Sequence, residues 1–105
     1  MNLLPYLLHF LAGALACNCI PHLAAGLRGE PFPSPLAKPP GQGHSSALVN
    51  TLWGSANLLA AFTLLSYWPL ALAWSLHAVS FWAGFVLIGC GTARHFERVR
   101  KDKTM

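Results

Sequence analysis

The fold is decided by residues 47–93, which read ALVNTLWGSANLLAAFTLLSYWPLALAWSLHAVSFWAGFVLIGCGTA. No Asp, Glu, Lys or Arg occurs in this stretch, or anywhere between Lys38 and Arg94. A soluble domain needs charged residues on its outer face, whereas a charge at the centre of a bilayer costs about 2.5–3.5 kcal/mol. Residues 1–27 are equally free of charge. The chain is therefore expected to be an integral membrane protein, with the lipid bilayer as its first partner.

The length of the apolar segments predicts how often the chain crosses the membrane. A helix needs about 20 apolar residues to span about 30 Å of hydrocarbon. Residues 47–93 are too many for one crossing, and we expect a turn at Ser66-Tyr67-Trp68-Pro69, because Pro69 lacks the N–H of a continuing helix and the two aromatic residues suit the membrane interface. The prediction is one all-α domain, residues 1–105, with three transmembrane helices at about 3–25, 48–66 and 70–92. The last two helices are expected to form a tight hairpin.

The basic residues predict the orientation. Five of the seven Lys and Arg residues lie in the tail, residues 94–105, and the other two lie in the loop of residues 28–46. The positive-inside rule then places the loop and the tail in the cytoplasm and the N-terminus outside. The net charge of +4 is thus a topology signal, and no basic stripe alternating with aromatic residues indicates nucleic-acid binding. A cleaved signal peptide is the alternative for the first helix, but no Lys or Arg precedes its apolar segment.

The loop of residues 28–46 differs in composition from the rest of the chain. Its five prolines exclude a helix and favour extended backbone. One interpretation is a spacer. The other is a docked cap, since Phe32 and Leu36 are apolar anchors that a spacer does not need. Ser45 or Ser46 is expected to cap the N-terminus of the second helix.

One part of the chain resembles a known group of proteins. The segment Phe32-Pro33-Ser34-Pro35-Leu36-Ala37-Lys38-Pro39-Pro40-Gly41, with Pro21-His22-Leu23 and Asn50-Thr51-Leu52-Trp53-Gly54, resembles small uncharacterised bacterial inner-membrane proteins. The resemblance runs from about His9 to Asn57. It implies a multi-pass protein of the bacterial inner membrane and no particular activity.

Small and polar residues gather on one face of each predicted helix. At about 100° per residue, the three stripes are His9, Gly13, Ala16 and Ile20 on the first helix, Asn50, Gly54, Asn57 and Ala61 on the second, and His77, Ser80, Gly84 and Gly91 on the third. Small residues let helices approach closely in lipid, and polar ones hydrogen-bond across the contact. The simplest interpretation is that the stripes pack the helices together.

The depth of two histidines suggests a function as well. His9 and His77 both lie about 10 Å inside the outer boundary by residue count, so antiparallel helices bring them to one level. An ionisable residue inside the membrane is a functional-site hypothesis. The predicted ligand-binding residues are therefore His9, Asn50, Asn57, His77 and Ser80. Trp53, Trp74 and Trp82 are large enough to line a cavity, although packing is the alternative for all three.

A metal site has weaker support. The motif Cys17-x-Cys19-x-x-His22 provides thiolates and an imidazole at spacings that suit zinc, and Cys90 or His95 could complete the four ligands. The candidate metal ligands are Cys19, His22 and Cys90. Against this, Cys17 and Cys19 point about 200° apart on a helix, and cysteine is also a common small buried hydrophobe. No motif identifies a cofactor.

Several chemistries have no candidate residues. No predicted span contains a carboxylate, so paired acid–base carboxylates are missing there, and the chain has no P-loop, dinucleotide fingerprint or GxSxG motif. An enzyme is therefore only a third option. The two main hypotheses are an oligomeric protein that binds or transports a small molecule, and a structural accessory subunit of a larger membrane complex with no ligand of its own.

Overall fold

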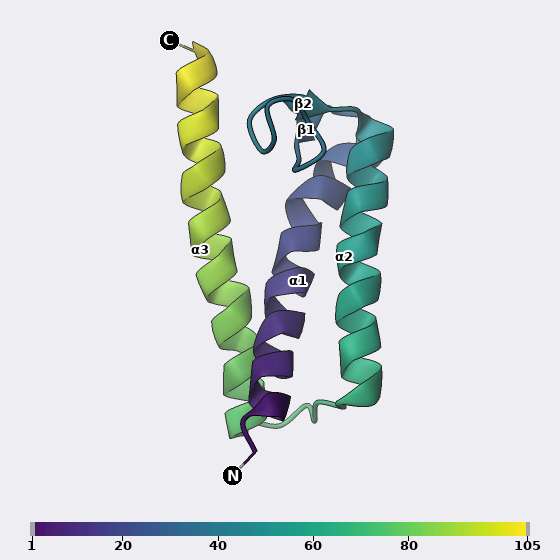
Figure 1. The fold of residues 1–105 in the computed structure, drawn as a ribbon, viewed down its shortest axis with the longest axis vertical. Helices are drawn as coiled ribbons and strands as arrows, with labels where there is room; N and C mark the ends of the chain where they lie inside the picture. The colour runs from purple at the N-terminus through teal and green to yellow at the C-terminus, as the bar shows by residue number, and fades with distance from the viewer. Residues whose placement is uncertain (1, 105) are drawn as a thin grey trace.

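The structure, a computed structural model, describes residues 2–104 and consists of three long helices with a small two-stranded sheet (Figure 1). The helices are α1 (Leu4–Leu27), α2 (Ala47–Tyr67) and α3 (Leu76–Thr104), and the strands β1 (Phe32–Pro33) and β2 (His44–Ser45) lie in the loop between α1 and α2. Each helix is long and apolar enough to cross a membrane. The predicted all-α fold with three spans is confirmed.

The first helix is the centre of the bundle. α1 packs along both α2 and α3, whereas α2 and α3 hardly touch each other. Glycines make these contacts close, because a Cβ added at Gly13 would collide with the α3 backbone at Phe81, and one added at Gly84 would collide with the α1 backbone at Phe10. Gly54 has the same role where α2 meets α1. Backbone thus lies directly against backbone, as small residues permit in membrane helices.

The predicted stripes agree with these contacts to different degrees. All four stripe residues of α2, Asn50, Gly54, Asn57 and Ala61, are buried. On α1 His9 and Gly13 are buried, but Ile20 is half-exposed, because a central helix contacts partners on two sides and one stripe cannot describe it. On α3 Gly84 is buried, whereas nothing lies near Gly91.

The predicted tight hairpin between the last two spans is wrong. α2 ends at Tyr67, close to the expected turn, but α3 begins at Leu76 and not at residue 70, so residues 68–75 connect the helices. The physical reason is that α1 lies between α2 and α3, and the connection must pass around its end (Figure 1). The Ser75 side chain accepts a hydrogen bond from the backbone N–H of Ala78 at 3.1 Å, as an N-cap does.

We call the loop of residues 28–46 the cap. The cap lies at one end of the bundle, together with the C-terminal part of α3, and the N-terminal end of α1 lies at the other end (Figure 1). α3 continues as a helix through the basic segment that begins at Arg94. Its 29 residues span about 43 Å, which exceeds the hydrocarbon thickness.

Pro21 lies within α1, where proline kinks a helix. α1 and α3 diverge towards the cap (Figure 1).

Candidate ligand pocket beneath the cap

The cap is docked on the helices. β1 and β2 pair antiparallel, with Phe32 opposite Ser45 and Pro33 opposite His44, and the hydroxyls of Ser34 and Ser45 share a hydrogen bond of 2.6 Å. Ser46 caps α2 by accepting a hydrogen bond from the N–H of Val49. The docked-cap interpretation describes this loop better than the spacer interpretation does.

One buried side chain joins the cap to the helices. The Asn50 amide donates hydrogen bonds to the carbonyls of Phe32, Ser45 and Ser46, at 2.9, 3.2 and 3.1 Å. Its oxygen lies 2.8 Å from Nδ1 of His22. Since the amide nitrogen faces three carbonyls, the oxygen must be the acceptor, so His22 carries its proton on Nδ1 and its Nε2 is free to accept. Asn50 is fully buried and holds the cap with its whole hydrogen-bonding capacity.

Aromatic contacts complete the docking. The Phe32 ring packs against Phe96 of α3, with centroids 4.7 Å apart, and edge-on against His22 at 5.7 Å. His95 donates from Nε2 to the Gly41 carbonyl at 2.8 Å, which ties the cap to α3 as well. Phe32 is thus the anchor we expected. Leu36 is not, because it is 64% exposed.

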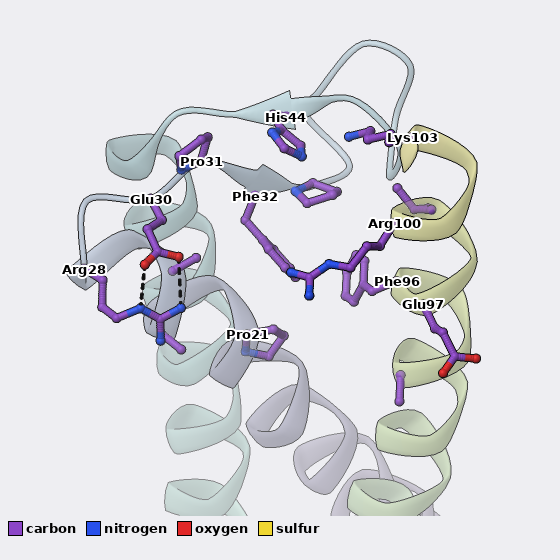
Figure 2. Close-up of a pocket in the computed structure, with 15 residues that line it drawn as sticks. Pro21, Arg28, Glu30, Pro31, Phe32, His44, Phe96, Glu97, Arg100 and Lys103 are labelled. Carbon is purple, nitrogen blue, oxygen red and sulfur yellow. Dashed lines mark hydrogen bonds and ion pairs between the residues drawn. The ribbon is translucent and has the colours of Figure 1, made fainter. Parts of the chain in front are cut away.

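Between the cap, α1 and α3 lies a pocket of about 760 Å³. Figure 2 shows the side chains that line it. The apolar part of the lining includes Pro21 and Ala24 of α1, Phe32 of the cap and Phe96 of α3. No residue of α2 takes part. The volume falls in the range of about 300–1,000 Å³ that is usual for small-molecule sites.

The charged lining is not balanced. Arg28 and Glu30 form a double hydrogen bond at 3.1 Å, and this interaction lowers the pKa of the Glu30 carboxyl, so the two charges cancel. Glu97 lies 3.8 Å from Lys101 and points away from the cap, whereas Arg100 and Lys103 reach from α3 towards the cap (Figure 2). Neither Arg100 nor Lys103 has an ion-pair partner among the side chains that the structure describes. The lining therefore carries three basic and two acidic side chains, a net charge of +1, above an apolar floor, and its excess positive charge lies at Arg100 and Lys103.

A second, smaller cavity of about 140 Å³ lies deeper under the cap, lined by Asn18, His22, Trp53 and His95 among others. The Trp53 indole N–H is buried and is the one buried side-chain polar atom without a hydrogen-bond partner in the described part of the chain. Buried donors are normally satisfied by protein or water. Trp53 lines this cavity, whose volume is large enough to hold water. Of the three tryptophans considered, Trp53 lines a cavity, while Trp74 and Trp82 are exposed.

The two predicted outer histidines meet. Nδ1 of His9 lies 3.1 Å from Nδ1 of His77, and Nε2 of His9 lies 2.8 Å from the Trp68 carbonyl. Because a carbonyl only accepts, His9 donates from Nε2 to Trp68, and its Nδ1 accepts from Nδ1 of His77. His77 also stacks on Tyr6, with centroids 4.2 Å apart. The pair therefore links α1, α3 and the end of α2, which is a structural role.

The other predicted site residues lie apart from this pair. Asn57 accepts from Asn18 at 3.1 Å and donates to the Trp53 carbonyl at 2.8 Å. Ser80 donates to the Leu76 carbonyl of its own helix. His9 and His77 occupy the contact between α1 and α3, whereas Asn50 and Asn57 occupy the contact between α1 and α2. The structure thus brings together two of the five predicted residues, and their ligand-binding role stays a prediction.

The metal candidates do not form a cluster. Among the described residues, no group of three or more His, Cys, Asp or Glu side chains could hold a metal ion. Cys19 donates to the Ala16 carbonyl, His22 is bonded to Asn50, and Cys90 is exposed. The cysteines are therefore explained as small helix residues.

Sequence reasoning missed the pocket residues of α3. Arg100 and Lys103 were interpreted only as topology signals, although Ala93, Phe96, Arg100 and Lys103 recur at helical spacing and mark one face of a continuing helix. Comparisons of the chain with protein-family models, curated proteins and solved structures find no match. The functional argument therefore depends on the site alone.

Proposed function

We propose that this chain is a small multi-pass membrane protein that binds a negatively charged small molecule in the pocket under the cap. The supporting observation is the pocket of about 760 Å³ with Arg100 and Lys103 uncompensated at its rim. An anion gains from both charges, and an apolar portion of the same molecule gains from the floor around Phe32 and Phe96. The setting that we propose is the bacterial inner membrane, with the cap and α3 end in the cytoplasm and the N-terminus outside.

Binding is better supported than transport. The His and Asn side chains inside the helices are hydrogen-bonded to one another or to backbone, and they occupy two different helix contacts. His9 and His77 lie between α1 and α3, while Asn18 and Asn57 lie between α1 and α2. These groups do not line one path through the single chain. A transport route, if the protein has one, would need helices from a second chain.

The test is to identify what the purified protein carries. Wild type and Arg100→Glu are purified in mild detergent, and the aqueous and organic extracts are compared by mass spectrometry. We expect an anionic compound at near-stoichiometric amount in wild type, lost in Arg100→Glu because the substitution reverses a rim charge. Arg98→Glu is the matched control, since Arg98 is exposed on the same helix outside the pocket. The proposal fails if both variants retain, or both lose, the compound.

The accessory-subunit hypothesis has an observation of its own. The polar stripes of α1 and α2 make contacts within the chain, as that hypothesis predicts. The outer faces of α2 and α3 carry exposed apolar side chains, among them Leu52, Phe62 and Leu87. Such side chains can contact either lipid or other helices. The mass of the protein in mild detergent, measured by light scattering, tests a homo-oligomer or a larger complex.

A further inference from the structure

The pocket lies where the uncharged spans give way to charged segments. Its lining begins with Pro21 of α1 and Ala93 of α3, within the uncharged spans that precede Arg28 and Arg94, and extends to Lys103. Ten residues separate Ala93 from Lys103 along α3, which is about 15 Å of helix. The pocket therefore extends from the edge of the hydrocarbon through the headgroup layer.

The walls of the pocket leave one side without protein. α1, the cap and α3 form the lining, and α2 contributes nothing to it. α1 and α3 diverge towards the cap (Figure 1), and the Pro-containing turn of α1 faces the space between them, as the position of Pro21 shows (Figure 2). The apolar floor is thus continuous with the surfaces of α1 and α3, two helices that are long and apolar enough to cross a membrane.

We infer that the pocket takes the phosphate headgroup of an anionic phospholipid from the adjacent leaflet. The phosphate lies against Arg100 and Lys103, and the glycerol and first acyl carbons lie along Ala24, Ala93 and Phe96. Basic pockets between membrane helices at the positive-inside face favour such headgroups. Guanidinium and ammonium groups both bind phosphate oxygens by charge-assisted hydrogen bonds. This inference rests on the proposed function and names the class of its ligand.

The experiment measures ligand binding to the delipidated protein in detergent by mass spectrometry of the intact protein. The probes are dioleoylphosphatidylglycerol, dioleoylphosphatidylcholine and sn-glycerol 3-phosphate. We expect phosphatidylglycerol to bind at least about tenfold more tightly than the other two, because it alone combines net negative charge with acyl chains. Arg100→Gln with Lys103→Gln should weaken phosphatidylglycerol about tenfold or more, as the loss of two basic contacts predicts.

The matched control is Arg94→Gln with Arg98→Gln, which removes the same charge from the same helix outside the pocket. An equal loss of affinity in this control would mean diffuse attraction to the basic segment and would overturn the inference. Equal binding of phosphatidylcholine would also overturn it. If sn-glycerol 3-phosphate binds and the lipid does not, the lipid inference is wrong while the proposed function stands. If no anion binds, and none co-purifies with wild type, the proposed function is wrong as well.

Discussion

At the scale of single residues, hydrogen-bond acceptors determine which ring nitrogen donates in the two buried histidines. His9 donates from Nε2 to the Trp68 carbonyl, and His22 donates from Nδ1 to Asn50, whose amide is committed to three carbonyls of the cap region. Both imidazoles thereby connect separate segments of the chain through hydrogen bonds. Removing either connection leaves a buried polar group without a partner, which costs about 1–3 kcal/mol for each group.

The Asn50 side chain offers the sharpest test at this scale. Asn50→Ala leaves His22 Nδ1 and at least two cap carbonyls without their partner, so we expect a loss of about 3 kcal/mol or more in the free energy of unfolding. The cap should also become a site of rapid proteolysis. Asn57→Ala is the control, because Asn57 lies outside the cap contacts and should leave the cap resistant. Denaturation in detergent and limited proteolysis measure the two effects.

The outer histidine pair gives a second residue-scale prediction. In a background without the three native cysteines, Cys replacements at His9 and His77 should cross-link more readily than a pair that does not face across the helix contact, because the two side chains point at each other with their Nδ1 atoms 3.1 Å apart. Cys replacements at His9 and Ser80 serve as the comparison, since Ser80 bonds within its own helix and not to His9. The change in electrophoretic mobility on oxidation measures the bond. Equal cross-linking of both pairs would contradict the specific pairing.

His77→Gln and His77→Ala separate the structural role of His77 from a binding role. Gln keeps a donor and an acceptor, so it should retain most of the stability, whereas Ala leaves His9 Nδ1 without its partner and should lower the unfolding free energy by about 1–3 kcal/mol. Neither variant should change retention of the pocket ligand, because His77 lies at the opposite end of α3. Selective loss of ligand in either variant would instead assign His77 to the binding site.

At the scale of elements, glycines determine which helices touch. Gly13 and Gly84 face each other's helix backbone between α1 and α3, and Gly54 lies against α1 from α2. Leu, Phe and Trp side chains cover the remaining faces. Lipid acyl chains are as apolar as these side chains, so the hydrophobic effect does not drive these faces against another helix. α1 therefore becomes the central helix because small residues occur on two of its sides.

Two glycines of α3 make a matched pair. Gly84→Leu should force α3 away from α1 and lower the melting temperature in detergent strongly, because an added side chain meets the Phe10 backbone, which cannot move aside. Gly91→Leu should be neutral or slightly stabilising, since nothing lies within 4 Å of its Cβ position and leucine is the better helix former. Similar melting temperatures for the two variants would show that the glycine contact does not hold α3.

At the scale of the whole molecule, charge separates the two ends. The end that carries the cap and the C-terminal part of α3 contains all seven basic residues, and the opposite end contains none. This asymmetry sets the direction of insertion, and the same basic residues supply the rim of the pocket. The positive-inside rule and the proposed function therefore assign two roles to this charge, and both include Arg100 and Lys103.

The orientation is tested with reporter fusions at the C-terminal end. A reporter active only in the cytoplasm should be active there, and one active only in the periplasm should be inactive. Replacing the five basic residues of α3 by Gln should weaken this preference, because the charge difference across the membrane falls from seven to two. Periplasmic activity in the wild type would contradict the three-span orientation.

The amino-acid sequence by itself determined the membrane character of the chain and the number of its helices. Both follow from local properties, namely the absence of charge over a length that spans a bilayer and the interruption near Pro69. The α2 stripe was equally predictable, because α2 has one partner and its small and polar residues therefore share one face. The same reasoning brought His9 and His77 to one level from residue counts alone.

Only the tertiary structure decided which helix is central, how the cap docks and where a ligand fits. Helical periodicity shows a face but not its partner, so the sequence favoured a hairpin of α2 and α3 where α1 actually separates them. The pocket joins Phe32 of the cap to Phe96 and Arg100 of α3. These two segments are far apart in the sequence, and their proximity depends on the Asn50 hydrogen bonds and the divergence of α1 and α3. Such sites arise from contacts between distant segments, and no local pattern encodes them.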